Sequence, residues 1–184
     1  MARPAYATDR LILTLATPAL AEAVAEYYLR NQDFLRPFEP VRTDAFFTAR
    51  GQRALLKQEA KLAREDRGYR FYLSLRETPT RVIGLAGLNN LVRGGFQSCF
   101  LGYKLDEGLL NRGYMTEAVR KLSELAFSEL ALHRIEANIM PRNVPSLRVA
   151  EKAGFVHEGL AVKYLNIGGV WEDHIHMVRR SDMN

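Results

Sequence analysis

The chain has 184 residues, of which 47% are apolar and 26% charged, as is typical of one globular domain over residues 1–184. No apolar run approaches membrane-spanning length, and the first residues lack the apolar core of a secretory signal. The net charge is +5, but the basic residues are dispersed and carry no nucleic-acid-binding motif. These features argue against membrane insertion and against direct, sequence-specific nucleic-acid recognition.

A single cysteine, Cys99, excludes an internal disulfide and predicts a protein of the reducing cytoplasm. Cys99 lies in a predicted strand, where a small buried residue is a better interpretation than a nucleophile. No Cys/His spacing indicates zinc, so no metal site is predicted.

The first half of the chain predicts one strand, two helices and an unusual loop. Thr17-Pro18 has the pattern of an N-cap followed by proline at the first helical position. The loop is apolar and contains Pro37 and Pro40, which make it stiff. In chain order the predicted elements are the strand 10–15, a helix ending near Arg30, the loop 31–42, and a helix from Thr43 or Asp44 to about Asp66.

The second half predicts strands around two further helices. Apolar residues from Met115 to Ala126 follow the helical period, and Asn143 has the position of an N-cap. Gly154 has the position of a C′ residue that ends the second helix. The predicted elements are strands at 69–75, 81–90 and 97–105, a helix from Tyr114, a strand at 134–140, a helix at 143–154, and a hairpin of strands 155–164 and 170–178. This order indicates an α+β sandwich around a mostly antiparallel sheet.

The turn 106–113 is the most informative segment. It joins a strand directly to a helix, and it contains Gly113 beside the cationic Arg112. A helix that begins after a glycine turn presents free backbone N–H groups and the positive end of its dipole. The segment therefore predicts a site for an anionic group such as pyrophosphate.

Together these motifs resemble the GNAT family of N-acetyltransferases, and in particular its Rim-type ribosomal-protein enzymes that acetylate an N-terminal alanine. The acetyl-CoA signature of the family covers residues 110–115, with Gly113 matching but Leu110 and Met115 departing from the general pattern. The resemblance extends over almost the whole chain, through Gly102-Tyr103, Thr116-Glu-Ala-Val119, His133-Arg-Ile-Glu136, Asn143, Ser146, Gly154-Phe155 and Trp171-Glu-Asp-His174. It implies a GNAT fold with a mixed sheet of about seven strands, splayed at its centre, and four helices.

The resemblance also implies acetyl-CoA as the acetyl donor, with CoA as a product and no metal. Pantetheine is expected between the splayed strands, and the N–H of Leu105 is a candidate donor to the oxyanion. Pyrophosphate is expected on the backbone amides of the turn. The implied cofactor contacts are Tyr103, Lys104, Leu105, Leu110, Asn111, Arg112, Gly113, Tyr114, Met115, Thr116, Asn138 and Asn143.

Catalytic roles are less sharply defined by the sequence. Ser146 follows Asn143 by one turn, where it is either a general acid for the departing thiolate or a simple first-turn serine. Glu39 is either a general base with a raised pKa or the partner of Arg36 or Arg42 in a surface ion pair. His133, His174 and His176 are further base candidates, although packing roles suit them better.

The loop 31–42 is expected to line the acceptor side, with Phe34, Phe38 and Glu39 contacting the amine. The implied acceptor is the N-terminal alanine of a small-subunit ribosomal protein. Two alternatives are acetylation of a small amine, such as an amino-acid conjugate, a polyamine or an antibiotic, and an acetyl-CoA-binding ribosome assembly factor with little turnover. The protein is expected to be a monomer or a homodimer.

Overall fold

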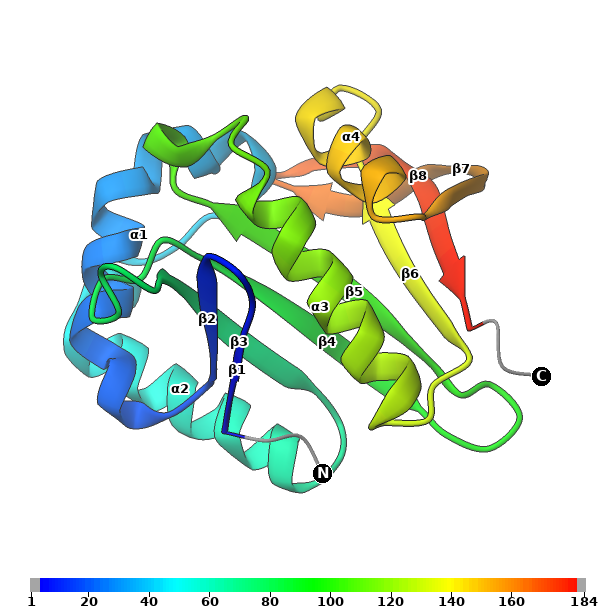
Figure 1. Ribbon diagram of the computed structural model, residues 1–184. Helices are drawn as coiled ribbons and strands as arrows, with labels where there is room; N and C mark the ends of the chain where they lie inside the picture. The colour runs from blue at the N-terminus through cyan, green and yellow to red at the C-terminus, as the bar shows by residue number, and fades with distance from the viewer. Residues whose placement is uncertain (1–3, 182–184) are drawn as a thin grey trace.

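A single mixed sheet organises the computed structural model, which describes residues 4–181. Its eight strands follow the order β1-β2-β3-β4-β5-β6-β8-β7, and every neighbouring pair is antiparallel except β5 and β6 (Figure 1). The strands are β1 (Ala5–Ala7), β2 (Leu11–Leu15), β3 (Tyr69–Leu75), β4 (Gly84–Val92), β5 (Ser98–Leu105), β6 (Arg134–Ile139), β7 (Val156–Ile167) and β8 (Val170–Arg180). The predicted mixed, mostly antiparallel sheet is confirmed.

Strand β1 was not predicted. It has three residues, of which only Tyr6 is buried, so its sequence carries no alternating pattern long enough to recognise. It forms because it pairs antiparallel with β2 at the edge of the sheet.

Four helices cover the two faces of the sheet (Figure 1). The helices α1 (Ala21–Leu35) and α2 (Ala49–Arg64) pack on one face, and α3 (Tyr114–Ser128) and α4 (Val144–Lys152) pack on the other. Each face has its own apolar cluster, the larger one under α3 and the smaller one between α1, α2 and the sheet. Cys99 belongs to the larger cluster, is 2% exposed, and has its pKa raised to about 12 by burial. The prediction that it is a small buried residue is confirmed.

Several predicted boundaries were wrong: the strand predicted at 81–90 is Gly84–Val92, the strand predicted at 155–164 is Val156–Ile167, and the first two helices also differ. Helix α1 continues to Leu35 instead of ending near Arg30, so the predicted loop begins later. Asparagine normally favours helix ends and turns, but Asn31 is 1% exposed here, donates to the carbonyl of Tyr27 (2.8 Å) and accepts from the N–H of Glu107 (3.0 Å). These tertiary contacts outweigh its local preference.

The second helix begins later than the sequence predicted. Residues Asp44–Phe47 form a 3₁₀ turn, and α2 starts at Ala49 after Thr48, whose Oγ1 accepts from the N–H of Gly51 (3.0 Å). Thr17 does flank a helical segment, as predicted, but its side chain makes no capping hydrogen bond. The 3₁₀ turn Pro18–Leu20 lies between Thr17 and α1.

The centre of the sheet is splayed, as predicted. The parallel ladder pairs Ser98, Cys99 and Phe100 of β5 with Arg134, Ile135 and Glu136 of β6 and then stops. Both strands continue, β5 to Leu105 and β6 to Ile139, and the continuing part of β5 pairs only with β4. Backbone groups on the facing edges of these two strands are therefore open to another partner.

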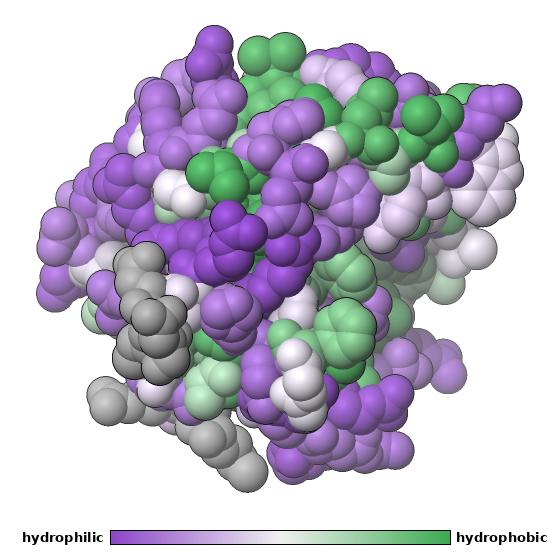
Figure 2. All heavy atoms as spheres, turned by 90° about the vertical axis from the view of Figure 1, so that its right-hand side faces the viewer, coloured by the Kyte–Doolittle hydropathy of each residue, from purple (hydrophilic) through white to green (hydrophobic). Residues whose placement is uncertain are grey.

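The β7–β8 hairpin ends the sheet with an unusually apolar surface. Leu160, Val162, Val170 and Trp171 are each more than half exposed. Figure 2 shows hydrophobic patches among largely hydrophilic residues on this side of the molecule. Within residues 4–181, none of the helices combines the length and the apolar character that crossing a membrane requires.

An ion pair fixes the end of β5 to α1. Arg30 donates through Nε to Asp106 Oδ2 (2.7 Å) and through Nη2 to the carbonyl of Val82 (2.9 Å). The Asp106 side chain is only 7% exposed and also accepts from the N–H of Gly108 (3.2 Å). Although its burial acts to raise the pKa, the hydrogen bond and charge of Arg30 hold the pKa of Asp106 below its usual range.

Replacing Arg30 with methionine leaves this carboxylate without its main partner, and we expect a loss of about 2 kcal/mol in the free energy of unfolding at pH 7. The folded-state pKa of Asp106 is lowered, so the stabilisation is present above the unfolded pKa of about 3.9 and disappears as the pH falls through the folded value. Urea denaturation should show that the free energies of unfolding of Arg30→Met and wild type differ less at pH 3.5 than at pH 7. Arg81→Met is the matched control, because Arg81 approaches the same carboxylate at 3.6 Å from a 55% exposed position. An equal loss for both variants would contradict the role of Arg30.

Candidate active site

A cavity of about 380 Å³ opens where β5 and β6 diverge. Its walls come from both helical layers, from the segment after α1, and from the β7–β8 hairpin through Leu165, Ile167 and His174. Of the candidate site residues named from the sequence, those that line it are Phe38, Glu39, Tyr103, Lys104, Asn138, Asn143, Ser146 and His174. The divergence of the strands thus brings together donor-side and acceptor-side candidates that are far apart in the chain.

Glu39 lies in an ion-pair cluster inside this cavity. Its carboxylate contacts the Lys104 ammonium directly and lies 3.7 Å from Arg42 Nη2, and the Glu39 side chain is 12% exposed. Of the two partners weighed from the sequence, Arg42 is present, whereas Arg36 instead pairs with Asp33 (2.7 Å). The Lys104 contact was missed, because Lys104 was predicted to contact the cofactor and nothing local connects the two residues.

The surroundings of Lys104 make its charge less stable than usual. Burial lowers its pKa, and the negative charge of Glu39 only partly opposes that effect. The Lys104 ammonium lies 5.3 Å from the centre of the Tyr28 ring, and this contact, like Glu39, favours the charged form. Lys104 therefore releases its proton more readily than an exposed lysine does.

Ser146 and Tyr103 form a reciprocal hydrogen-bonded pair across the opposite side of β5. Ser146 Oγ donates to the Tyr103 hydroxyl oxygen (3.0 Å), and the Tyr103 hydroxyl donates to the carbonyl of Ser146 (2.8 Å). Burial raises the pKa of Tyr103 to about 12, with the bond to Ser146 acting in the other direction. The two hydroxyl groups link the first turn of α4 to β5.

Two asparagines face the cavity from β6 and from the start of α4. Asn143 caps α4 as predicted, with its Oδ1 accepting from the N–H of Ser146 (3.3 Å). Asn138 Oδ1 is buried, and within residues 4–181 it makes no hydrogen bond. A buried amide oxygen without a partner is costly, which indicates a donor supplied by a ligand or by water.

The histidine candidates occupy three different environments. His133 is exposed at the opposite end of β6 from the cavity. His176 Nδ1 lies 2.9 Å from Glu136 Oε1, while His174 lines the cavity with its Nδ1 3.0 Å from the carbonyl of Glu172. His174 and His176 both contact the ring of Tyr164, which fits the predicted packing roles.

The predicted pyrophosphate turn lies outside the cavity lining, between β5 and α3. Gly113 is the N-cap of α3 with φ of 78°, and Asn111 also has a left-handed φ of 60°. Tyr114, Met115 and Thr116 form the first turn of α3, so their N–H groups precede the first helical hydrogen bonds. Met115 is 5% exposed and belongs to the core, which leaves its backbone for a ligand. Leu110 likewise packs against the core, and Arg112 is exposed.

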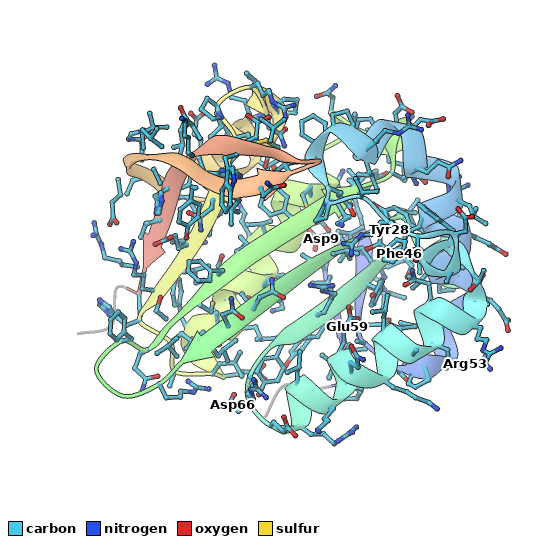
Figure 3. The ribbon with its side chains drawn as sticks, turned by 180° about the vertical axis from the view of Figure 1, so that it is seen from behind. Asp9, Tyr28, Phe46, Arg53, Glu59 and Asp66 are labelled. Atoms are coloured by element: carbon cyan, nitrogen blue, oxygen red, sulfur yellow. The ribbon has the colours of Figure 1, made fainter. Side chains whose placement is uncertain are left out.

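The acceptor wall differs from the one predicted. Phe34 lies in α1 and packs against the smaller apolar cluster, outside the cavity lining, whereas Phe38 lines the cavity. Arg142 secures the Phe38 segment by donating to the carbonyl of Pro37 (3.2 Å) and to Glu172 (2.7 Å). Tyr28 and Phe46 pack edge to face on each other and line the cavity (Figure 3). Sequence reasoning missed both residues.

A second ion pair that sequence reasoning missed also lines this cavity. Glu59 extends from α2 towards the sheet (Figure 3), where it accepts from Arg70 (2.7 Å) and from the hydroxyl of Tyr72 (2.9 Å). Arg70 also donates to Asn89 Oδ1 (3.1 Å). The sequence predicted a helix around Glu59 and a strand around Arg70 and Tyr72, but nothing local in it reveals that the two elements contact each other here.

The comparisons with known proteins agree with this geometry. Residues 10–156 match the family described as the acetyltransferase (GNAT) domain. The chain is 45% identical over 144 residues to the probable N-acetyltransferase YjcK of Bacillus subtilis (strain 168), covering 78% of this chain and 79% of that protein. It is 36% identical over 169 residues to the ribosomal protein uS5-alanine N-acetyltransferase of Escherichia coli (strain K12), covering 91% of this chain and 86% of that protein.

Solved structures show the same relationship. The ribosomal-protein-S5-alanine acetyltransferase from Vibrio fischeri has a TM-score of 0.92 at 34% identity, with 97% of both chains covered. Mycobacterium smegmatis RimJ in complex with CoA-disulfide has a TM-score of 0.88 at 27% identity, with 94% of this chain and 82% of that chain covered.

The fold and the matched sequence define the class of this protein as an acetyltransferase. The chain belongs to the GNAT family, and its relatives are N-acetyltransferases. The predicted resemblance to the Rim-type enzymes and to RimJ is confirmed in both sequence and fold.

Gly102 offers a test of the cavity itself. A Cβ at this position would meet only Asn89 Nδ2, at 3.7 Å, so Gly102→Val should fold normally while its side chain occupies the cavity. We expect kcat/KM for acetyl transfer to fall about ten-fold or more. Gly95→Val is the control, because it adds the same group at an equally open position in the β4–β5 turn, outside the lining. Unchanged kcat/KM in a folded Gly102→Val protein would place the reaction elsewhere.

Proposed function

We propose that this protein transfers an acetyl group from acetyl-CoA to a primary amine by direct attack, and that the amine is the N-terminal alanine of a small-subunit ribosomal protein. The observation that carries the proposal is the separation of β5 from β6 after three residue pairs, together with the left-handed Gly113 that begins α3 after the turn following β5. Support for the acceptor comes from the relatives, one of which is named for the alanine of ribosomal protein uS5. Such a reaction would take place in the cytoplasm.

The chain offers suitable groups for the thioester, the pantetheine arm and the pyrophosphate of the donor. The open edge of β5 at Tyr103, Lys104 and Leu105 would pair with the pantetheine amides, and Asn138 and Asn143 would hydrogen-bond the same arm. The Leu105 N–H would donate to the developing oxyanion. The amides of residues 110–116 would bind the pyrophosphate at the positive end of α3. The unpartnered Asn138 Oδ1 fits a ligand that carries amide donors.

The acceptor amine must lose a proton before it can attack. We assign Glu39 to receive that proton, since it is a largely buried carboxylate in the cavity. In the free protein Lys104 is its partner, and the lowered pKa of Lys104 allows an entering ammonium to take its place beside Glu39. Ser146 would then supply a proton to the departing thiolate, with Tyr103 connected to it by a hydrogen bond.

The role of Ser146 can be tested by removing each hydroxyl of the pair in turn. General acid help is typically worth about 10²- to 10⁴-fold in rate, and thiolate is already a fair leaving group, so Ser146→Ala should lower kcat by about 10²-fold. The KM for acetyl-CoA should stay near wild type. Tyr103→Phe is the companion variant, because it keeps the ring and removes only the hydroxyl. If Ser146→Ala retains full kcat while Tyr103→Phe loses it, the acid is Tyr103 and Ser146 only begins the helix.

A small-amine acceptor is the alternative that the cavity also accommodates. Glu39 and Glu59 are two carboxylates in one cavity, and a diamine or an amino-acid conjugate could use both. A binding protein with little turnover is the third possibility, and steady-state transfer assays would distinguish it from both enzymes.

The first residue of the acceptor should be small, because Phe38, Phe46 and Tyr28 limit the space beside Glu39. In a panel of peptides that differ only at the first residue, we expect alanine and serine to be acetylated well and bulky residues poorly. Phe38→Ala should flatten this preference. Phe34→Ala is the matched control, because it removes the same ring from α1 outside the cavity and should leave the preference intact. If free small amines outcompete every peptide, the ribosomal acceptor is wrong and the acetyltransferase activity still stands.

A further inference from the structure

Arg10 holds the turn that precedes α3, although it belongs to a distant part of the chain. It lies in the turn between β1 and β2, and its Nη1 donates to the carbonyl of Arg112 (2.9 Å). Its Nε and Nη2 reach Glu117 Oε2 at 2.7 and 2.6 Å. Its guanidinium also lies 4.5 Å from the centre of the Tyr114 ring. One side chain therefore contacts the turn, the first residue of the helix and the first helical turn.

The turn needs such support because of its backbone. Asn111 and Gly113 both have left-handed φ values, 60° and 78°, and a non-glycine residue in that region is strained. A Cβ on Gly113 would lie 3.4 Å from Arg10 Nη2, so Arg10 packs directly on the outer side of the turn. The orientation of the amides in this segment thus depends on a contact from outside it.

Glu117 places a carboxylate in the first turn of α3, so its charge must be neutralised if an anion is to bind at this helix end. A negative charge there is favourable for the helix dipole but repels a second anion at the same helix end. The carboxylate is fully engaged in the free protein, because it also accepts from the Thr8 hydroxyl (2.5 Å) and from the backbone N–H of Arg10 (3.0 Å). These hydrogen bonds and the Arg10 charge outweigh the effect of burial and lower the pKa of Glu117, which stays ionised.

We propose that Arg10 is a positioning residue for donor binding: it clamps the turn at Arg112 and cancels the charge of Glu117, so that the amides of residues 110–116 accept pyrophosphate. This inference rests on the proposed use of acetyl-CoA. Arg10 does not touch the reacting atoms, and its effect is confined to the pyrophosphate end of the donor.

The test compares two donors that differ in the pyrophosphate. Arg10→Met should raise KM for acetyl-CoA by about ten-fold and leave kcat close to wild type, because it removes the charge-assisted contact with the Arg112 carbonyl and the ion pair with Glu117. For acetyl-pantetheine, which has no pyrophosphate, kcat/KM should be unchanged. The double variant Arg10→Met/Glu117→Gln should recover part of the acetyl-CoA affinity, because it removes the repelling carboxylate but does not restore the clamp.

Arg76→Met is the matched control, because Arg76 is also exposed and contacts the same β1–β2 turn at the carbonyl of Asp9, but it does not contact the α3 turn. If Arg10→Met unfolds, Arg10→Lys provides the same comparison, since a single ammonium cannot hold Arg112 and Glu117 together. Equal effects on the two donors, or no difference from Arg76→Met, would overturn the clamp. A wild-type protein that neither binds nor uses acetyl-CoA would instead overturn the proposed function.

Discussion

The short parallel ladder between β5 and β6 is the constraint on which the rest of the site depends. Three residue pairs join the two halves of the sheet, and beyond Phe100 and Glu136 the strands separate. Backbone groups at the centre of a sheet normally find partners, because an unpaired buried amide costs about as much as a lost hydrogen bond. The antiparallel pairs on either side satisfy the other edges, so the inner edges alone remain for an extended ligand that carries amides.

The alternation of side chains along β5 separates the two halves of the proposed reaction. Neighbouring residues of a strand point to opposite faces, so Tyr103 reaches α4 and Ser146, whereas Lys104 reaches the α1 side and Glu39. Arg30 and Asp106 then fix the end of this strand to α1. Ser146, the proposed proton donor to the thiolate, and Glu39, the proposed proton acceptor from the amine, thus lie on opposite sides of one strand.

The sequence predicted what local periodicity determines and missed what distant contacts determine. The strand predicted at Tyr69–Leu75 and the helix predicted after the glycine before Tyr114 lie where the structure has β3 and the start of α3. The same reasoning ended α1 at Arg30, because Asn31 favours a loop unless a distant turn engages its side chain. For the same reason, the contact between Lys104 and Glu39 left no trace in the sequence. Its partners lie in elements that only the tertiary fold brings together.

The charge balance of the cavity decides how an amine can enter it. Arg42, Arg70 and Lys104 face Glu39 and Glu59, so with all five ionised the cavity already holds an excess of positive charge. Arg70 remains charged because, despite its burial, Glu59 raises its pKa. Lys104 is the cation whose pKa is lowered overall, because burial outweighs the charge of Glu39, and its loss of a proton would keep the excess at one positive charge when an ammonium arrives. In the proposed reaction the amine would then meet a Glu39 carboxylate released from Lys104, give up its proton there, and face the thioester in its nucleophilic form.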